Sequence, residues 1–254
     1  MISRPFAMAL ASLLCCVFGL AQSENSLVDQ TRETNPPVRT LTAEERGDIL
    51  MARKMYREAI EVFQTDSKSA IVQNKIGIAY HQLQQLEFAR KSYERALKIK
   101  PDYSEAVNNL GTVYYAKKSY RRAISYYLKA LRLNPDSASI YSNLGTAYFA
   151  RKKYEQATTA YSKALSLDPN VFERRSAYGT LLEDRNVEER AKFHYYLAKM
   201  YAKSGRNELA MQYVRKALEE GFKDKKKFND DPEFEALRQL PEFRDLLTVE
   251  PRVL

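Results

Sequence analysis

Apolar residues recur along the central part of the chain with the spacing of helices that bury one face. In the segment 104–137, Val107, Leu110 and Val113 fall on one side of a helix. A polar turn at 117–119 follows. The apolar positions of the next helical stripe are Tyr120, Ala123, Ile124, Tyr127, Leu128 and Leu131. The segment therefore predicts two antiparallel helices joined by a short turn.

This pattern returns every 34 residues, at Gly77, Gly111 and Gly145. Each glycine is followed at fixed distances by a tyrosine, an alanine, a second tyrosine, a second alanine and a proline. These positions are Tyr80, Ala89, Tyr93, Ala96 and Pro101, then Tyr114, Ala123, Tyr127, Ala130 and Pro135, then Tyr148, Ala157, Tyr161, Ala164 and Pro169. We expect the glycine and the first alanine where two helices cross closely, with the tyrosines filling the space beside them. The second alanine is expected at the next helix pair, and the proline at the end of the second helix.

A period of 34 residues with this order of small, aromatic and proline positions resembles the tetratricopeptide repeat family. The segments 70–103, 104–137 and 138–171 carry the whole signature. The resemblance implies an all-α fold, a right-handed superhelical solenoid of helix–turn–helix repeats. It also implies a protein that binds other proteins and is not an enzyme.

Two weaker copies flank the three strong ones. The first, at about 40–69, lacks the closing alanine and proline, and the last, at 191–224, has Phe222 at the place of the proline. Terminal repeats are expected to be atypical because one of their faces lacks a neighbouring repeat. The predicted solenoid thus spans 40–224, with 172–190 as an insert between repeats.

The tail at 225–254 contains two short Pro-Glu-Phe segments, which begin at Pro232 and Pro241. Proline and glutamate are favoured in the first turn of a helix. The tail is therefore predicted to form C-terminal capping helices that cover the last repeat.

The first 21 residues form a short apolar segment that ends with the small residues Gly19 and Ala21 at alternate positions, which is typical of a signal peptide cleaved after Ala21. The polar stretch 22–39 is predicted to be a flexible linker. We expect an exported bacterial protein, periplasmic or secreted, whose mature form has lost Cys15 and Cys16. The alternatives are an uncleaved membrane anchor and a lipoprotein.

Basic residues outnumber acidic ones, 41 against 32, and the formal net charge is +9. Runs such as 117–118, 151–153 and 225–227 place several of them in turns. Ordinary solubility explains this surplus, and attraction to an anionic membrane surface is the alternative. Nucleic acid fits the charge but not an exported protein, so no nucleic-acid partner is expected.

The sequence offers little chemistry for catalysis. His81 and His194 are the only histidines and stand in different repeats, and no accompanying carboxylate or cysteine cluster is expected. We therefore predict no catalytic residue, no metal site and no cofactor.

Outward positions of the first helices are expected to line a concave groove for a peptide or protein partner. The candidate residues are Asn74, Ile78, His81, Asn108, Thr112, Tyr115, Ser142, Thr146, Phe149, Tyr195 and Lys199, and Ile71 shares their face. We interpret Ile78, Tyr115 and Phe149 as apolar anchors. The alternative is that the chain's own linker or tail covers the groove.

The leading hypothesis is a non-enzymatic interaction scaffold of the bacterial cell envelope. The alternative is a membrane-peripheral assembly factor for a pilus or outer-membrane type of complex, acting through a basic edge. Capture of a terminal carboxylate is not expected, because Ser139 and Asn143 stand where the family's clamp would need lysine and arginine. The partner's identity and the oligomeric state stay open.

Overall fold

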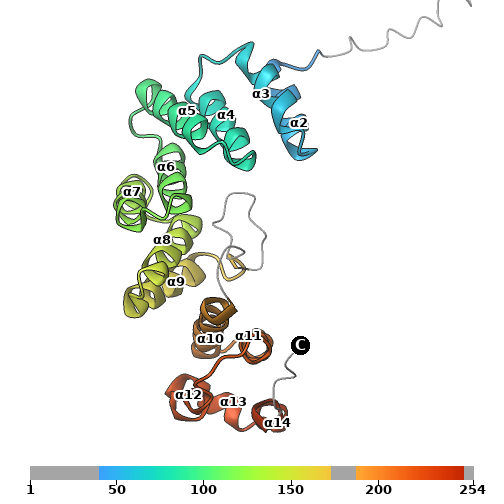
Figure 1. Cartoon of the computed structure of the whole chain (residues 1–254), viewed down its shortest axis with the longest axis vertical. Helices are drawn as coiled ribbons and strands as arrows, with labels where there is room; N and C mark the ends of the chain where they lie inside the picture. The colour runs from blue at the N-terminus through green and yellow to red at the C-terminus, as the bar shows by residue number, and fades with distance from the viewer. Residues whose placement is uncertain (1–39, 173–186, 249–254) are drawn as a thin grey trace, which may run out of the picture. The chain divides into compact units, whose positions relative to one another are not determined.

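The computed structural model describes residues 40–172 and 187–248 (Figure 1). The predicted signal peptide and the whole of the predicted linker lie outside these residues. Contacts divide the chain into two units, Met1–Thr42 and Ala43–Leu254, and every helix discussed below belongs to the second.

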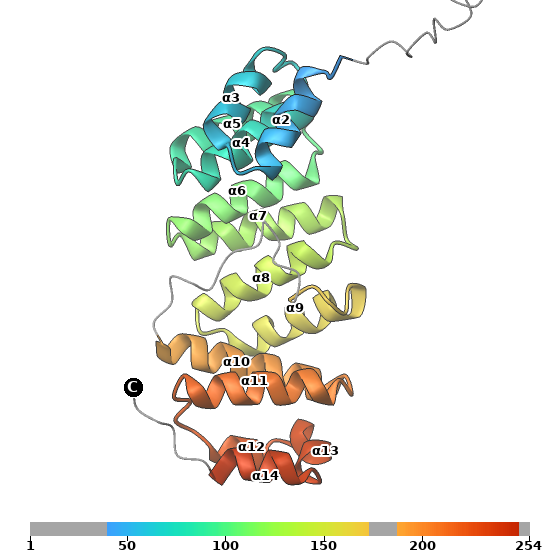
Figure 2. The same cartoon turned by 90° about the vertical axis from the view of Figure 1, so that its right-hand side faces the viewer.

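Five pairs of antiparallel helices follow one another along the described chain, which contains no strand (Figure 2). The pairs are α2 (Ala43–Ala52) with α3 (Tyr56–Gln64), α4 (Ala70–Gln82) with α5 (Leu86–Ile99), α6 (Ser104–Ala116) with α7 (Tyr120–Leu133), α8 (Ala138–Ala150) with α9 (Tyr154–Leu167), and α10 (Val187–Lys203) with α11 (Asn207–Glu219). Each pair packs against the next in sequence. The predicted all-α fold of helix–turn–helix repeats is confirmed.

The helix α10 begins earlier than the last repeat was expected to begin. Its first turn, from Val187, belongs to the predicted insert and is continuous with the repeat helix. Glu188 and Glu189 stand in this turn, where carboxylates interact favourably with the helix dipole. The rest of the insert from 173 to 186 lies outside the described residues.

The repeat glycines mark the close helix crossings, as predicted. A Cβ atom on Gly111 would lie 2.5 Å from Cε1 of Tyr127, and Gly77 and Gly145 face Tyr93 and Tyr161 in the same way. These three tyrosines are 0–1% exposed. Only a residue without a side chain lets the first helix approach the ring of the second helix this closely.

The turn inside each helix pair contains one residue in the left-handed backbone region. Lys54, Gln84, Lys118 and Lys152 have φ of 58–60°, and Gly205 occupies the same place in the last pair. The Lys118 and Ser119 amides donate to the carbonyls of Tyr115 and Tyr114, which closes the end of α6. A left-handed conformation is costly for a residue with a Cβ atom.

Replacing Lys118 by glycine should therefore stabilise the protein, by about 0.5–1 kcal/mol. Urea unfolding followed by circular dichroism measures the change. Lys118→Ala is the control, because alanine removes the charge while keeping the strained backbone, and it should bring no gain. Equal stabilisation by both variants would show that charge, and not backbone conformation, is the cause.

The tail forms short helical segments that pack on the last pair. They are α12 (Lys226–Asp230), a 3-10 turn η2 (Pro232–Phe234), α13 (Glu235–Arg238) and α14 (Pro241–Thr248). Phe228, Phe234 and Phe243 are each 0% exposed and join one core with Tyr195 and Phe222. The tail thus closes the apolar end of α10 and α11, as capping helices should.

Candidate functional site

Most of the candidate groove residues are buried within the chain. The buried ones, at 2–9% exposure, are Asn74, Ile78, Asn108, Thr112, Thr146, Phe149 and Tyr195. The expectation that repeat packing leaves these positions free is wrong for all seven. The first helices of neighbouring pairs also contact each other, α4 with α6 and α6 with α8, which covers the positions on these three helices. Phe149 and Tyr195 are covered by other parts of the chain, which are described below. The remaining four, His81, Tyr115, Ser142 and Lys199, are half-buried.

Asparagine side chains connect the first helices of three successive repeats. Asn109 Nδ2 donates to Asn74 Oδ1 at 2.9 Å, and Asn143 Nδ2 donates to Asn108 Oδ1 at 3.1 Å. Asn108 Nδ2 also donates to Asn109 Oδ1 at 3.3 Å, which joins the two junctions. All four amides are 4–8% exposed, where an unpaired polar group would be costly. We call this set the asparagine ladder.

Phe149, expected as an apolar anchor for a partner, has an internal role instead. Its ring centroid lies 5.3 Å from that of Tyr154, 5.6 Å from Phe193 and 5.8 Å from Tyr196, all in edge-on geometry. The ring thereby ties α8 to α9 and α10. Among the first-helix apolar residues, Ile71 is 49% exposed, so it presents more surface than Ile78 at 9%.

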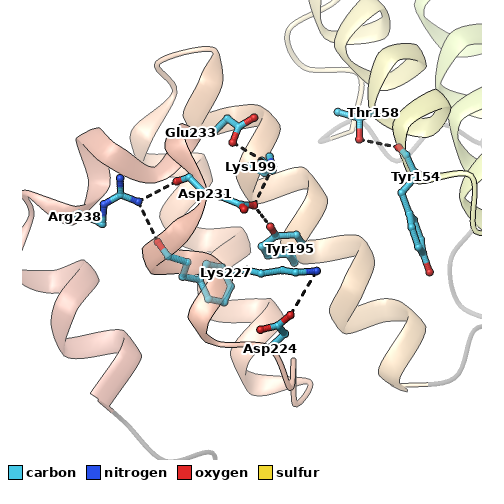
Figure 3. A network of polar contacts seen from close by, with 10 residues as sticks. Tyr154, Thr158, Tyr195, Lys199, Asp224, Lys227, Asp231, Glu233 and Arg238 are labelled. Carbon is cyan, nitrogen blue, oxygen red and sulfur yellow. Dashed lines mark hydrogen bonds and ion pairs between the residues drawn. The ribbon is translucent and has the colours of Figure 1, made fainter.

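The tail covers the candidate residues of the last repeat, which was the alternative left open from the sequence. The Tyr195 hydroxyl donates to Asp231, and Lys199 Nζ lies 2.9 Å from Asp231 Oδ2 and 3.2 Å from Glu233 Oε2 (Figure 3). Arg238 donates to the Asp231 carbonyl at 2.9 Å, which fixes the same segment from its other side. An acidic segment of the chain itself therefore binds Tyr195 and Lys199 and covers them.

The sequence matches family models described as tetratricopeptide repeat at 138–171 and 175–224, and as TPR repeat at 77–118 and 111–150. These matches cover more than half of the chain. The chain belongs to the tetratricopeptide repeat family.

Solved structures with a similar arrangement include two that differ in coverage. One, titled "Crystal structure of MamA", is 22% identical, covers 68% of this chain and 93% of its own, and has a TM-score of 0.47. Another, "First TPR of Spaghetti (RPAP3) bound to HSP90 peptide SRMEEVD", is 30% identical, covers 42% of this chain and 86% of its own, and has a TM-score of 0.40. None of the curated proteins matches the sequence.

His194 of this tetratricopeptide protein lies next to a carboxylate, a contact that the sequence did not reveal. His194 Nδ1 lies 2.9 Å from Glu220 Oε2, and Arg190 Nε lies 3.2 Å from Glu220 Oε1. The sequence did not reveal this single contact, because Glu220 follows α11, the helix that packs against α10. Burial lowers the pKa of His194 and the Glu220 charge opposes this, so the imidazole is favoured in its neutral form at neutral pH.

This histidine contact does not by itself amount to a site for chemistry. Within 40–172 and 187–248, no group of three or more histidine, cysteine or acidic side chains is arranged to hold a metal ion. In the same ranges, no helix is both long and apolar enough to cross a bilayer. Burial also lowers the pKa of His81, which lies in a different repeat.

The Asp231 contacts predict a dependence of stability on pH. Burial raises the pKa of Asp231, but hydrogen bonds from Tyr195 and Lys199 and the Lys199 charge outweigh it, so the pKa lies below the ordinary 3.8. A carboxyl whose pKa is lower in the folded state stabilises the fold above its unfolded pKa. This stabilisation is lost as the pH falls through the folded pKa.

Asp231→Asn should therefore reduce the free energy of unfolding by about 1–2 kcal/mol near pH 7, and by less near pH 3. Urea unfolding at both pH values measures the difference from wild type. Asp230→Asn is the matched control, since Asp230 is exposed and adjacent. A deficit of the Asp231 variant that is the same at both pH values would contradict the role given to its charge.

Proposed function

We propose that this tetratricopeptide repeat protein is a non-enzymatic scaffold that holds a peptide or protein segment against the first helices of its repeats. The observation that carries the proposal is the repeat family itself, whose helix pairs stack into a continuous binding surface. The residues that remain accessible on the expected face are Ile71, His81, Tyr115 and Ser142. They combine one exposed aliphatic side chain, one phenol ring and two polar groups, which suits a mixed peptide segment.

Affinity capture from the organism's own envelope fraction tests the scaffold role. Ile71→Ser should lose a partner that wild type retains, because Ile71 is 49% exposed on the first helix α4. Ile99→Ser is the matched control, since Ile99 is 50% exposed but lies at the end of the second helix α5. A partner that is equally reduced by both variants, or by neither, would count against binding to the first helices.

The cellular location belongs to the proposal as well. The apolar segment 1–21 supports export, with cleavage after Ala21 and a periplasmic or secreted mature chain. Mass spectrometry of the protein purified from its native cells would then find Gln22 at the N-terminus. A chain that keeps Met1 would indicate a membrane anchor, and a lipid-modified Cys15 or Cys16 would indicate a lipoprotein.

One observation favours a second candidate function. This function is peripheral attachment to an anionic membrane during assembly of an envelope complex. Lys54, Lys118 and Lys152 are exposed and occupy equivalent left-handed positions in three turns, although this backbone region disfavours lysine. Lysine therefore recurs at equivalent turn positions although its backbone conformation there is unfavourable. This recurrence supports a role for the lysine charges in a basic edge.

Flotation with vesicles of phosphatidylglycerol tests this second function. Wild type should float in a salt-sensitive manner, and the triple variant Lys54→Gly, Lys118→Gly, Lys152→Gly should stay in solution. Because glycine is well suited to these backbone positions, the variant should remain folded. An absence of wild-type flotation at low salt would dismiss the membrane role and leave the scaffold proposal intact.

A further inference from the structure

A cavity of about 190 Å³ lies where the last repeat meets the tail. We call it the junction pocket. Its walls come from the start of α9, from α10 and from the segment 221–227, which leads from α11 into the first turn of α12. These are parts of the chain that the proposed first-helix surface at Ile71 and Tyr115 does not use.

The floor of the junction pocket is aromatic. Tyr154 and Tyr196 are stacked, with centroids 5.1 Å apart and planes 16° apart. Tyr195 and Phe222 form a second stacked pair at 4.5 Å and 8°. The Tyr195 and Tyr196 rings meet edge to face at 5.2 Å, so the two pairs form one continuous lining. Such a lining favours binding of an apolar or aromatic group over binding of a small inorganic ion.

The rim of the junction pocket carries more cations than anions. Lys192, Lys223 and Lys227 line it together with two carboxylates, Glu188 and Asp224. Lys192 lies 2.9 Å from Glu188 and Lys223 3.8 Å from it, and Lys227 lies 3.5 Å from Asp224. All these groups are exposed to solvent by 41–81% of their side-chain surface. Ion pairs this exposed are weak, so an incoming carboxylate can exchange for the internal ones.

Several lysine charges act on the rim carboxylate Glu188. The pKa of Glu188 is lowered first by the hydrogen bond from Lys192 and then by the charges of Lys192, Lys223 and Lys152. Lys152 belongs to the run 151–153 and Lys227 to the run 225–227. Tyr154, Tyr195, Asp224 and Lys227 can be followed in Figure 3. The excess positive charge at the rim therefore favours an anionic ligand.

The neighbouring contact between the tail and α10 shows what kind of anionic segment these elements accept. Tyr195, which lines the pocket, also binds Asp231 through its hydroxyl, while Lys199 one turn later pairs with Asp231 and Glu233. The Phe234 ring follows in the same segment, with its centroid 6.0 Å from that of Tyr195. An acidic segment with a phenylalanine thus already packs against this part of α10 within the chain.

We propose that the junction pocket binds an acidic peptide segment of a partner protein, with one aromatic side chain inserted into the aromatic floor. Its cavity is smaller than the roughly 300–1,000 Å³ typical of pockets that enclose whole small-molecule ligands. One side chain enters it, and the flanking carboxylates pair with Lys192, Lys223 and Lys227 at the rim. This is a second binding site, which uses the first helix of the last repeat and none of the residues Ile71, His81, Tyr115 and Ser142.

Fluorescence anisotropy with a labelled, end-blocked peptide of sequence Glu-Asp-Phe-Glu-Asp tests the proposal on the full mature chain. We expect saturable binding by wild type that is weakened at least about tenfold by Lys223→Glu with Lys227→Glu. Lys203→Glu with Lys226→Glu is the matched control, because both lysines are exposed, outside the pocket lining, and the net charge changes equally. The control and Ile71→Ser should bind like wild type.

Three results would overturn the proposal. The first is no saturable binding by wild type. The second is equal binding of a peptide with alanine in place of the phenylalanine, which would reduce the site to unspecific charge attraction. The third is a dependence on Lys223 and Lys227 seen with phosphatidylglycerol vesicles but not with the peptide, which would indicate a lipid headgroup. Because Ile71→Ser is measured in parallel, none of these results bears on the scaffold proposal.

Discussion

Phe234→Ala should lower the free energy of unfolding by about 3–5 kcal/mol, the largest loss expected from any single change proposed for this protein. The Phe234 side chain is 0% exposed, and its ring lies 5.3 Å from Phe228 and 6.1 Å from Phe243. Alanine would leave a cavity between the tail and the last repeat, and these aromatic rings cannot collapse into it without breaking their mutual contacts.

The loss of stability should also be concentrated in one part of the molecule, the last repeat. Helix pairs in such arrays are stabilised mainly by their nearest neighbours, so a weakened cap should expose α10 and α11 before α4 to α7. Hydrogen exchange followed by mass spectrometry measures this order, and guanidinium unfolding gives the total loss. Phe88→Ala is the control, because Phe88 is 54% exposed and its removal should cost far less. Uniform loss of protection along the whole chain would contradict a local role for the cap.

Gly111→Leu should cost about 3 kcal/mol of stability despite the higher helix propensity of leucine. A Cβ atom alone would lie 2.5 Å from Cε1 and 2.6 Å from Cδ1 of Tyr127. The Tyr127 side chain is 0% exposed, so it is held among other side chains and cannot simply turn out into solvent. The two helices of the middle repeat would have to separate, which disturbs their contacts with both neighbouring pairs.

A double-mutant cycle with Tyr127→Ala distinguishes this cause from a general effect of leucine. If the ring is the obstacle, Gly111→Leu should cost less in the Tyr127→Ala background than in wild type, because the new side chain can fill the vacated space. Chemical denaturation of the four proteins gives the coupling free energy. A coupling near zero would mean that the glycine is required for another reason.

The repeat signature was sufficient to predict the helix pairs because it records local packing. Gly77, Gly111 and Gly145 each face the tyrosine that follows them by 16 positions, so contacts within one pair are visible as spacings in the chain. The cap was predictable for a similar reason, since the two Pro-Glu-Phe segments mark helix starts and supply Phe234 and Phe243.

Contacts between pairs were harder to predict. Asn74 and Asn108 looked accessible because a helical wheel describes one helix in isolation, whereas α6 packs against both α4 and α8. His194 and Glu220 approach each other only because α10 and α11 are antiparallel. The junction pocket depends on three separated parts of the chain, including the extra first turn of α10 that carries Glu188. Its one signal in the sequence was the basic run 225–227, which supplies Lys227.

The asparagine ladder bears on how such an array can change its length in evolution. Each junction joins the sixth position of one repeat to the fifth position of the repeat before it, through Asn109 with Asn74 and Asn143 with Asn108. The middle repeat therefore contributes to both contacts, through Asn109 to the repeat before it and through Asn108 to the repeat after it. Duplication of a whole 34-residue unit would extend the chain of amides, and its loss would let Asn143 meet Asn74. An insertion of a few residues within α6 would shift Asn108 and Asn109 out of register and leave buried amides unpaired. Along the asparagine ladder, a full 34-residue repeat is therefore the unit that can be gained or lost without breaking these contacts.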